Sequence, residues 1–246
     1  MTSLRFRASG LLKERILARY RIPFSRSGLD GALVSFLSAD APLTVVDAGA
    51  STGGFLDAVT AYCGVRRAWL IEPQPARCRE LEEKYRGRGF AVFAGALSDQ
   101  DGVATMDILN FDYSSSLLPA MPDAAGAGKQ LDLGVREKIQ VPVRTLDSLL
   151  AGAGPAEPID VFKIDVQGNE LKVLRGARQS LRRTRLIWVE VSFRPLYEGS
   201  AVFSEVYDFL HDQGFYLGAL QEGFRGDGRE LLQADALFLA LDRKTL

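Results

Sequence analysis

A short β-branched run that leads into a glycine-rich turn constrains the fold of this chain more than any other stretch. The run from Leu43 to Val46 is apolar except for Thr44, which suits a parallel strand that is covered on both faces. Asp47 ends the run, and the glycines at 49, 53 and 54 let the backbone bend sharply and approach a ligand. The helix predicted next begins with N–H groups that have no partner inside the helix, so it can hold a small anion. The stretch predicts a strand–turn–helix unit with a ligand beside the turn.

The spacing of these glycines narrows the ligand class. Gly-x-x-x-Gly-Gly differs from the Gly-x-Gly-x-x-Gly of dinucleotide sites, and the chain has no Gly-x-x-x-x-Gly-Lys-Ser/Thr motif for a nucleoside triphosphate. Asp47 would repel a pyrophosphate and attract a cation. A ligand with a carboxylate beside an ammonium suits both halves of the turn, and the amino-acid end of S-adenosylmethionine is such a ligand. The turn alone is equally consistent with an ordinary α/β connection.

Length and composition place the chain among ordinary globular proteins. Its 246 residues suit one decorated α/β domain, and a formal net charge of −1 argues against non-specific nucleic-acid binding. No apolar run approaches the roughly 20 residues that cross a bilayer, and the N-terminus lacks the apolar core of a secretion signal. Cys63 and Cys78 form neither a disulfide framework nor a metal-binding spacing, so we expect reduced thiols in a cytoplasmic protein.

Residues 1–40 are predicted to form a helical extension that precedes the main domain, residues 41–246. Apolar residues recur at helical spacing between Leu11 and Tyr20, and a second helix is expected from Leu29 to Leu37. The first part is basic, with Glu14 as its acid; its cations are Arg5, Arg7, Lys13, Arg15, Arg19, Arg21 and Arg26. The extension is either a cap helix with a solvated face or a surface for an anionic substrate, lipid head groups or a partner.

Strands and helices alternate after the turn. Further strands are expected at Ala68–Pro73, Phe90–Ala94, Ile159–Asp165 and Leu186–Val191, with helices at Phe55–Cys63, Ala76–Tyr85, Leu146–Leu149 and Gly168–Leu181. The C-terminal part adds a helix at Phe203–Gln213 and strands at Phe215–Leu220 and Ala236–Leu241. Residues 102–110 and 138–143 alternate like antiparallel strands, and the Ser/Gly-rich segment between them is either a binding loop or a surface insertion. The order predicts an α/β fold with a mostly parallel, doubly wound sheet and an antiparallel C-terminal edge.

Four of the predicted strands end in an acid, and in open α/β sheets ligands bind beyond those ends. The acids are Asp47, Glu72, Asp165 and Glu190. If the first, fourth and fifth parallel strands are neighbours, three of the acids line one crevice, although acids are also common at exposed strand ends. Lys163 lies inside an apolar strand, so burial requires a partner, which we expect to be Asp165 or Glu190. Convergent acids could hold Mg²⁺ or Ca²⁺, but their spacing is not diagnostic and we assign no metal site.

Taken together, these segments resemble the FkbM-type S-adenosylmethionine-dependent methyltransferases. The matching segments are Val46–Gly53, Ile71–Pro73, Ala96–Asp99, Ser115–Leu117, Val141–Asp147, Phe162–Glu170, Leu174–Ala177 and Val189–Val191. Their order and spacing are far more specific than the glycine turn. The chain departs from the family pattern at Gln167, where Glu is more common, and in its basic extension. Gln167 cannot act as a base, whereas Glu170 remains available.

The resemblance implies a class I methyltransferase (Rossmann-like) fold, S-adenosylmethionine as cofactor and methylation of a hydroxyl on a sugar, glycan or secondary metabolite. It implies that the methionine end lies at the turn, the ribose at Glu72 and the adenine near Ser98. The implied cofactor-binding residues are Asp47, Gly49, Ala50, Ser51, Gly53, Glu72, Pro73, Ala96, Ser98, Asp99 and Asp165.

The expected reaction is in-line attack of a substrate hydroxyl on the sulfonium methyl, helped mainly by positioning. The hydroxyl also loses a proton, and the candidate base is Asp165 first and Glu190 second, with Lys163 orienting a carboxylate or assisting proton transfer. The alternative is a non-catalytic protein with the same fold that binds a membrane surface or polyanion through its basic N-terminal arm. We expect Phe111–Lys129, Ser192–Ala201 and Gln221–Gln233 to select the acceptor.

Overall fold

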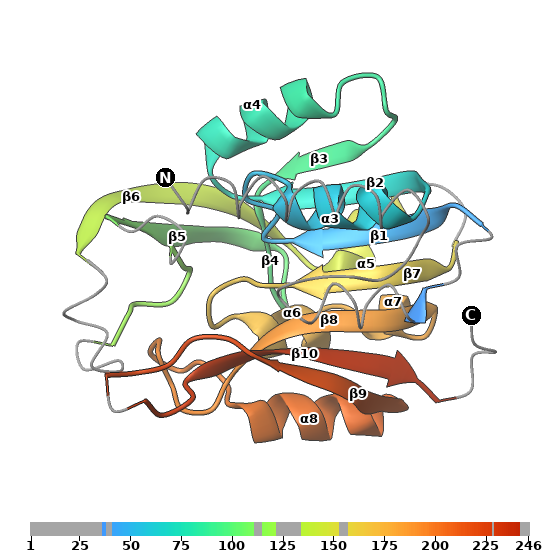
Figure 1. Ribbon diagram of the computed structural model, residues 1–246. Coiled ribbons are helices and arrows are strands. Elements are labelled where there is room, and N and C mark those ends of the chain that lie inside the picture. Colours follow the sequence, from blue (N-terminus) through green and yellow to red (C-terminus); the bar gives the residue numbers. More distant parts are fainter. Residues whose placement is uncertain are drawn as a thin grey trace, which may run out of the picture.

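The computed structural model describes residues 36–37, 41–110, 115–121, 134–152, 157–227 and 229–241. The predicted basic cluster and the first extension helix lie outside these residues, as does most of the second. Seven strands form the main sheet, in the order β3-β2-β1-β7-β8-β10-β9 (Figure 1). The first five are parallel to one another, whereas β10 is antiparallel to both β8 and β9. The predicted class I methyltransferase-type fold, with its antiparallel C-terminal edge, is confirmed.

The elements follow one another largely as the sequence predicts. The main-sheet strands are β1 (Leu43–Ala48), β2 (Val65–Glu72), β3 (Ala91–Ala94), β7 (Ile159–Ile164), β8 (Thr184–Ser192), β9 (Phe215–Glu222) and β10 (Gln233–Ala240). The helices are α3 (Gly54–Tyr62), α4 (Pro75–Lys84), α5 (Leu146–Ala151), α6 (Glu170–Arg175), α7 (Arg178–Leu181) and α8 (Phe203–Asp212). Within the part of the chain that the structure describes, no helix is long and apolar enough to cross a membrane.

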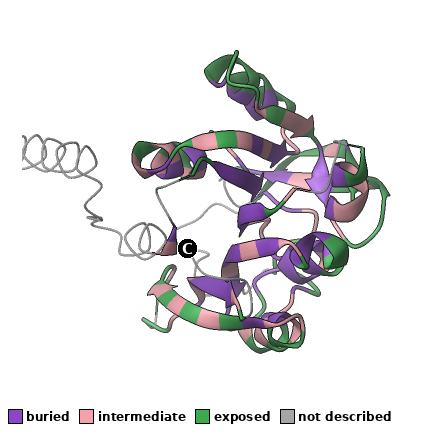
Figure 2. Cartoon of the chain, turned by 90° about the vertical axis from the view of Figure 1, so that its right-hand side faces the viewer, coloured by how far each residue is buried: buried purple, intermediate pink, exposed green. Residues whose placement is uncertain are grey.

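The main sheet is covered on both faces, which explains its nearly continuous apolar strands. Neighbouring residues of one strand enter different cores: Val45 packs with α3, and Val46 packs with the helices from α5 to α8. The same division separates Val161 from Phe162 in β7. The central strands are therefore buried and the outer helix surfaces exposed (Figure 2). Strands of this kind show no two-residue alternation, as the sequence of β1 predicts.

A smaller sheet stands beside the carboxyl ends of the main strands (Figure 1). It consists of β4 (Ala96–Leu97), β6 (Val135–Arg144) and β5 (Gly102–Leu109), in that order, with β5 and β6 antiparallel. The chain leaves and returns at one place, because the Asp101 carboxylate accepts hydrogen bonds from the Thr145 N–H at 2.7 Å and the Ser148 hydroxyl at 2.7 Å. The two ends of the segment from residue 102 to residue 144 therefore lie next to each other.

The prediction of a single helix at Gly168–Leu181 is wrong. The chain forms α6 and α7 instead, with a break at Gly176. A side chain at this position would overlap the carbonyl oxygen of Ser98, so the backbone of another segment packs against the break. Asp147 then begins α7 by accepting from the N–H groups of Gln179 at 2.9 Å and Ser180 at 2.8 Å. Both contacts are non-local, and helical periodicity carries no sign of them.

Candidate active site

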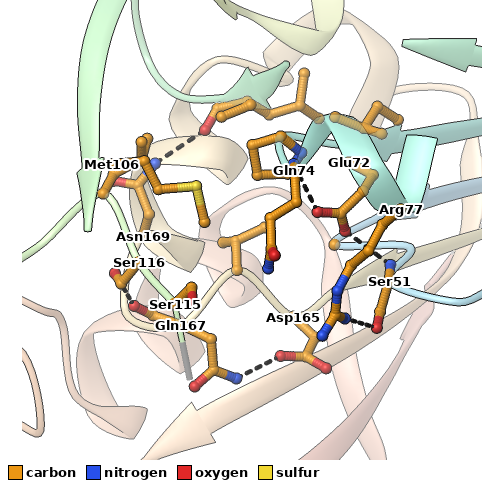
Figure 3. Close-up of a pocket in the computed structure, with 17 residues that line it drawn as sticks. Ser51, Glu72, Gln74, Arg77, Met106, Ser115, Ser116, Asp165, Gln167 and Asn169 are labelled. Carbon is orange, nitrogen blue, oxygen red and sulfur yellow. Dashed lines mark hydrogen bonds between the residues drawn. The ribbon is translucent and has the colours of Figure 1, made fainter. Parts of the chain in front are cut away.

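A cleft opens where β1, β2 and β7 end, and the small sheet forms one of its walls (Figure 3). Its lining comes from the glycine turn, the segment after β2, the small sheet with the serines that follow it, and the β7–α6 loop. These residues are Gly49, Ser51, Ile71, Glu72, Pro73, Gln74, Arg77, Ala96, Leu97, Met106, Ser115, Ser116, Leu117, Asp165, Val166, Gln167 and Asn169. The cleft lies where ligands bind in open α/β sheets.

The glycine turn adopts the backbone that the sequence predicts. Gly49 has φ +79°, and a side chain there would overlap the carbonyl oxygen of Asp165. Its N–H and that of Ala50 both donate to the carbonyl of Ile71 at 3.0 Å, which ties the turn to the end of β2. Gly53 has φ +81° and packs against Tyr85 rather than on the cleft. Of these two glycines, Gly49 is therefore the one whose backbone lines the cleft.

Glu72 presents a carboxylate that is fixed by two backbone N–H groups. Ser51 donates to one oxygen at 2.8 Å and Gln74 donates to the other at 2.9 Å (Figure 3). A carboxylate has about four lone-pair sites, so each oxygen can still accept from a ligand. Burial raises the pKa of Glu72, although the two N–H groups and Arg77 oppose that shift. The arrangement suits a ligand with neighbouring hydroxyl groups.

Asp47, Lys163 and Asp165 form a charged chain under the turn. The register of β1 and β7 places Asp47 opposite Lys163, and the ammonium lies 3.3 Å from Asp47 and 3.5 Å from Asp165. It also donates to the Gly49 carbonyl at 2.6 Å. Burial raises the pKa of Asp47. Burial alone would lower the pKa of Lys163, but the carboxylates of Asp47 and Asp165 outweigh it and raise that pKa.

Glu190 is held apart from this chain. Its carboxylate accepts from the side-chain amides of Gln167 at 3.0 Å and Gln233 at 2.7 Å. The prediction that Lys163 pairs with Asp165 or Glu190 is therefore right for Asp165, while the nearer carboxylate is that of Asp47. Two-residue alternation identified the acid on the same strand, but only the pairing of β1 with β7 brings Asp47 opposite the lysine.

The structure brings part of the predicted set together at the cleft. Gly49, Ser51, Glu72, Pro73, Ala96 and Asp165 belong to the lining. Asp47 is completely buried beneath the turn, Ala50 is buried as well, and Lys163, Gly53 and Glu190 are also outside the lining. Ser98 and Asp99 border a neighbouring hollow, which shares Leu117 and Asn169 with the cleft. Asp165, by contrast, leaves 38% of its side chain exposed.

Sequence reasoning missed several residues of the lining. Arg77 reaches from the first turn of α4 and donates to the Ser51 hydroxyl, but its place in a charged helix gave no signal. Asn169 lies within the recognised β7–α6 segment and donates to the Leu97 carbonyl at 2.9 Å, which joins that segment to the small sheet. Ser116 contributes from the serine-rich segment.

Acids dominate the titratable groups around the cleft. Glu170 is buried and accepts from the N–H groups of Val166 and Gly168, both at 3.1 Å. Burial raises its pKa to about 7, and the two N–H groups oppose that shift. Among the described residues, no group of three or more His, Cys, Asp or Glu is placed to hold a metal ion. The negative surroundings favour a cationic ligand.

Comparisons with known proteins agree with this geometry. The methyltransferase FkbM domain matches residues 47–217. The chain is 30% identical over 202 residues to the 2-O-methyltransferase NoeI of Sinorhizobium fredii, with 77% of this chain and 79% of that protein covered. The fold is similar to the crystal structure of methyltransferase FkbM from Methylobacillus flagellatus KT, with a TM-score of 0.53 and 17% identity. That match covers 88% of this chain, which spans 47% of the longer protein. The chain therefore belongs to the FkbM methyltransferase family.

Proposed function

We propose that the protein transfers a methyl group from S-adenosylmethionine to a hydroxyl of a sugar, glycan or small hydroxylated metabolite. The observation that carries the proposal is Glu72, which offers a fixed carboxylate at the end of β2, beside the glycine turn. In Rossmann-like folds a carboxylate at this place binds the ribose hydroxyls of a nucleoside. Membership of a methyltransferase family and the name of the 2-O-methyltransferase relative support a hydroxyl acceptor.

The residues of the cleft fit the cofactor in shape and in charge. Gly49 lines the cleft with backbone alone, and a side chain there would overlap the Asp165 carbonyl, so this position lets the methionine end approach the turn closely. The sulfonium and ammonium of the cofactor are positive, and the carboxylates of Asp165 and Glu72 face the same cleft. Bound S-adenosylmethionine supplies an electrophilic methyl group.

Asp165 is the proposed base. It lines the cleft and is partly exposed, and one of its oxygens accepts from Gln167 at 2.7 Å. Its remaining lone pairs can take the proton of an acceptor hydroxyl that lies within hydrogen-bond distance. Glu190 is the weaker candidate because it is outside the lining and both neighbouring amides donate to one of its oxygens.

Calorimetric titration tests the cofactor. We expect the wild-type protein to bind S-adenosylmethionine, and we expect Glu72→Gln to bind about tenfold more weakly, because an amide replaces a charged acceptor. Glu82→Gln, on the exposed side of α4, is the matched control and should bind as the wild type does. No binding to the wild-type protein at millimolar cofactor would refute the proposal.

Methyl transfer from labelled cofactor tests the acceptor class and the base. A panel of methyl glycosides and small hydroxylated metabolites should contain an acceptor that gains label. With that acceptor, Asp165→Asn should lower turnover by about 100-fold, while cofactor affinity falls by no more than about tenfold because one carboxylate beside the cationic ligand is lost. An equal loss of affinity would make Asp165 a binding residue, and unchanged turnover would remove it from the mechanism.

A further inference from the structure

Gln167 has a backbone conformation that few residues with a side chain adopt. Its φ is +56°, in the left-handed region, where side chains other than those of Asn, Asp and His are uncommon. Two contacts hold the loop in this form. The Ser116 hydroxyl donates to the Gln167 carbonyl at 2.5 Å, and Tyr197 packs where a side chain on Gly168 would lie. The loop therefore places the Gln167 side chain at one fixed point in the cleft wall.

The amide of Gln167 uses both of its N–H groups on carboxylates. Its nitrogen donates to Asp165 at 2.7 Å (Figure 3) and to Glu190 at 3.0 Å. Its oxygen accepts from the Tyr197 hydroxyl at 2.8 Å. The reverse orientation would direct the amide oxygen at two carboxylates, so the chemistry of the neighbours fixes the amide.

The surroundings of this amide carry an excess of negative charge. The titratable groups on the elements around it are Asp47, Lys163, Asp165, Glu170, Glu190, Tyr197 and Asp235. Lys163 is directed at Asp47 and Asp165, and not at Glu190. Burial and the neighbouring acids raise the pKa of Glu190. Because the Gln167 amide is neutral and has two N–H donors, its nitrogen can bind the carboxylates of Asp165 and Glu190 at the same time.

We propose that Gln167 is a positioning residue, which holds the Asp165 carboxylate in the cleft by bridging it to Glu190, with Tyr197 fixing the amide. The role assigned to Asp165 rests on the proposed function, whereas the bridge itself does not. A glutamate could not form this bridge, because even a protonated carboxyl has a single O–H to donate. An ionised one would add a third negative charge between the other two.

The first experiment uses ligand-free protein and compares Gln167→Glu with the wild type by thermal unfolding at pH 5 and pH 8. The neighbours should raise the folded-state pKa of the added carboxyl, so its cost grows as the pH rises above the unfolded value of about 4.3. The loss of melting temperature should therefore be about 5 °C larger at pH 8 than at pH 5. Gln140→Glu, which adds the same charge on an exposed strand position, should show no such difference. Equal losses at both pH values in Gln167→Glu would overturn the bridge.

The second experiment measures S-adenosylmethionine affinity between pH 6 and pH 8 as the ratio of Gln167→Glu to wild type, which cancels the titration of the cofactor itself. Binding of a cation beside Asp165 should release the proton held by the introduced carboxyl. The affinity of the variant relative to the wild type should therefore rise with pH by up to about tenfold per pH unit. A constant ratio would overturn the proposal, since a purely structural change has no pH profile. Absence of binding by the wild type would refute the proposed function, and the ligand-free measurement would still decide the bridge.

A third set of variants covers the case in which Gln167→Glu does not fold. Gln167→Gly removes the amide and tolerates the positive φ, and Tyr197→Phe removes the hydroxyl that orients the amide. We expect about tenfold weaker cofactor binding for the first and about threefold for the second. The double variant should bind no more weakly than Gln167→Gly alone, because Tyr197 acts through the amide. Wild-type affinity in Gln167→Gly, or effects that multiply, would overturn the proposal.

Discussion

Replacement of Lys163 by methionine isolates the electrostatic part of the site. The Asp47 carboxylate is completely buried, and no hydrogen bond from the described residues reaches either of its oxygens, so the Lys163 ammonium at 3.3 Å is the partner that supports its charge. Methionine keeps the length and apolar stem of lysine and removes the charge. The substitution therefore leaves a buried carboxylate beneath the glycine turn without its cation.

Two independent arguments give the size of the effect. At 3.3 Å and an effective dielectric constant of about 20, the attraction between the two charges is about 5 kcal/mol. Protonation of the stranded carboxyl sets an upper bound, because protonating a group of ordinary pKa near 3.9 costs about 4 kcal/mol at pH 7. We therefore expect Lys163→Met to lower the free energy of unfolding by about 3–4 kcal/mol at pH 7. For a domain of this size, that corresponds to a melting temperature about 6–16 °C lower.

The pH dependence has a defined sign. Without Lys163 the folded-state pKa of Asp47 rises further above its unfolded value, so the penalty begins near pH 4 and grows until the folded pKa is reached. At pH 5 the cost of protonation falls to about 1.5 kcal/mol. Urea unfolding at pH 5 and pH 7 should thus show a smaller loss at the lower pH. Adding Asp47→Asn to Lys163→Met should recover part of the loss at pH 7, because no buried charge then remains.

Lys138→Met supplies the matched control. Lys138 pairs with Asp107 at 2.8 Å, but 62% of its side chain is exposed, and exposed ion pairs contribute about 0–1 kcal/mol. A loss below 1 kcal/mol for Lys163→Met at pH 7, or equal losses at pH 5 and pH 7, would refute the view that the lysine supports a buried carboxylate.

Three further changes probe the frame around the cleft. Gly49→Ala should destabilise the fold and weaken cofactor binding by tenfold or more, because a methyl group would overlap the Asp165 carbonyl and Gly49 has a positive φ. A melting curve measures the first effect and a cofactor titration the second. Glu170→Gln should gain stability relative to the wild type as pH rises from 4.5 to about 7, by about 1–3 kcal/mol, since burial raises the pKa of Glu170 to about 7; a wild-type curve parallel to that of the variant would contradict this. Asp147→Ala removes the two hydrogen bonds that begin α7 and should cost about 1–2 kcal/mol in urea unfolding, and an unchanged midpoint would count against the cap.

The sequence predicts the main sheet well because local signals and long-range structure agree there. The run from Leu43 to Val46 is continuous and β-branched, and it is buried on both faces as such runs usually are. The terminal acids marked the carboxyl ends of β2 and β7, where the cleft opens. Glu72 and Asp165 line it, which places the predicted cofactor and base candidates at one site, while their roles stay predictions until the variants are measured.

The sequence could not predict contacts that depend on the pairing of distant segments. Asp47 faces Lys163 through the register of β1 with β7, which no local pattern records. Two predicted strands, at residues 102–110 and 138–143, proved to pair in a separate sheet that faces the cleft. Arg77 lies in a charged helix turn whose composition is that of any exposed surface, yet it is 8% exposed and borders the cleft. At Gln167 the sequence showed only that a carboxylate was missing. That its amide bridges Asp165 and Glu190 depends on how two distant segments pack.

The hydrogen bond between Asp101 and Thr145 has a consequence for engineering this protein. Residues 102–144 begin and end at this hydrogen bond, so the distance that the rest of the domain must bridge does not depend on the sequence of that segment. One wall of the cleft is carried by this stretch, and the opposite wall, with Glu72, remains on the main sheet. Positions 101 and 145 are therefore natural crossover points for chimeras with other members of the family. Such chimeras would exchange one wall as a cassette and show separately what each wall recognises.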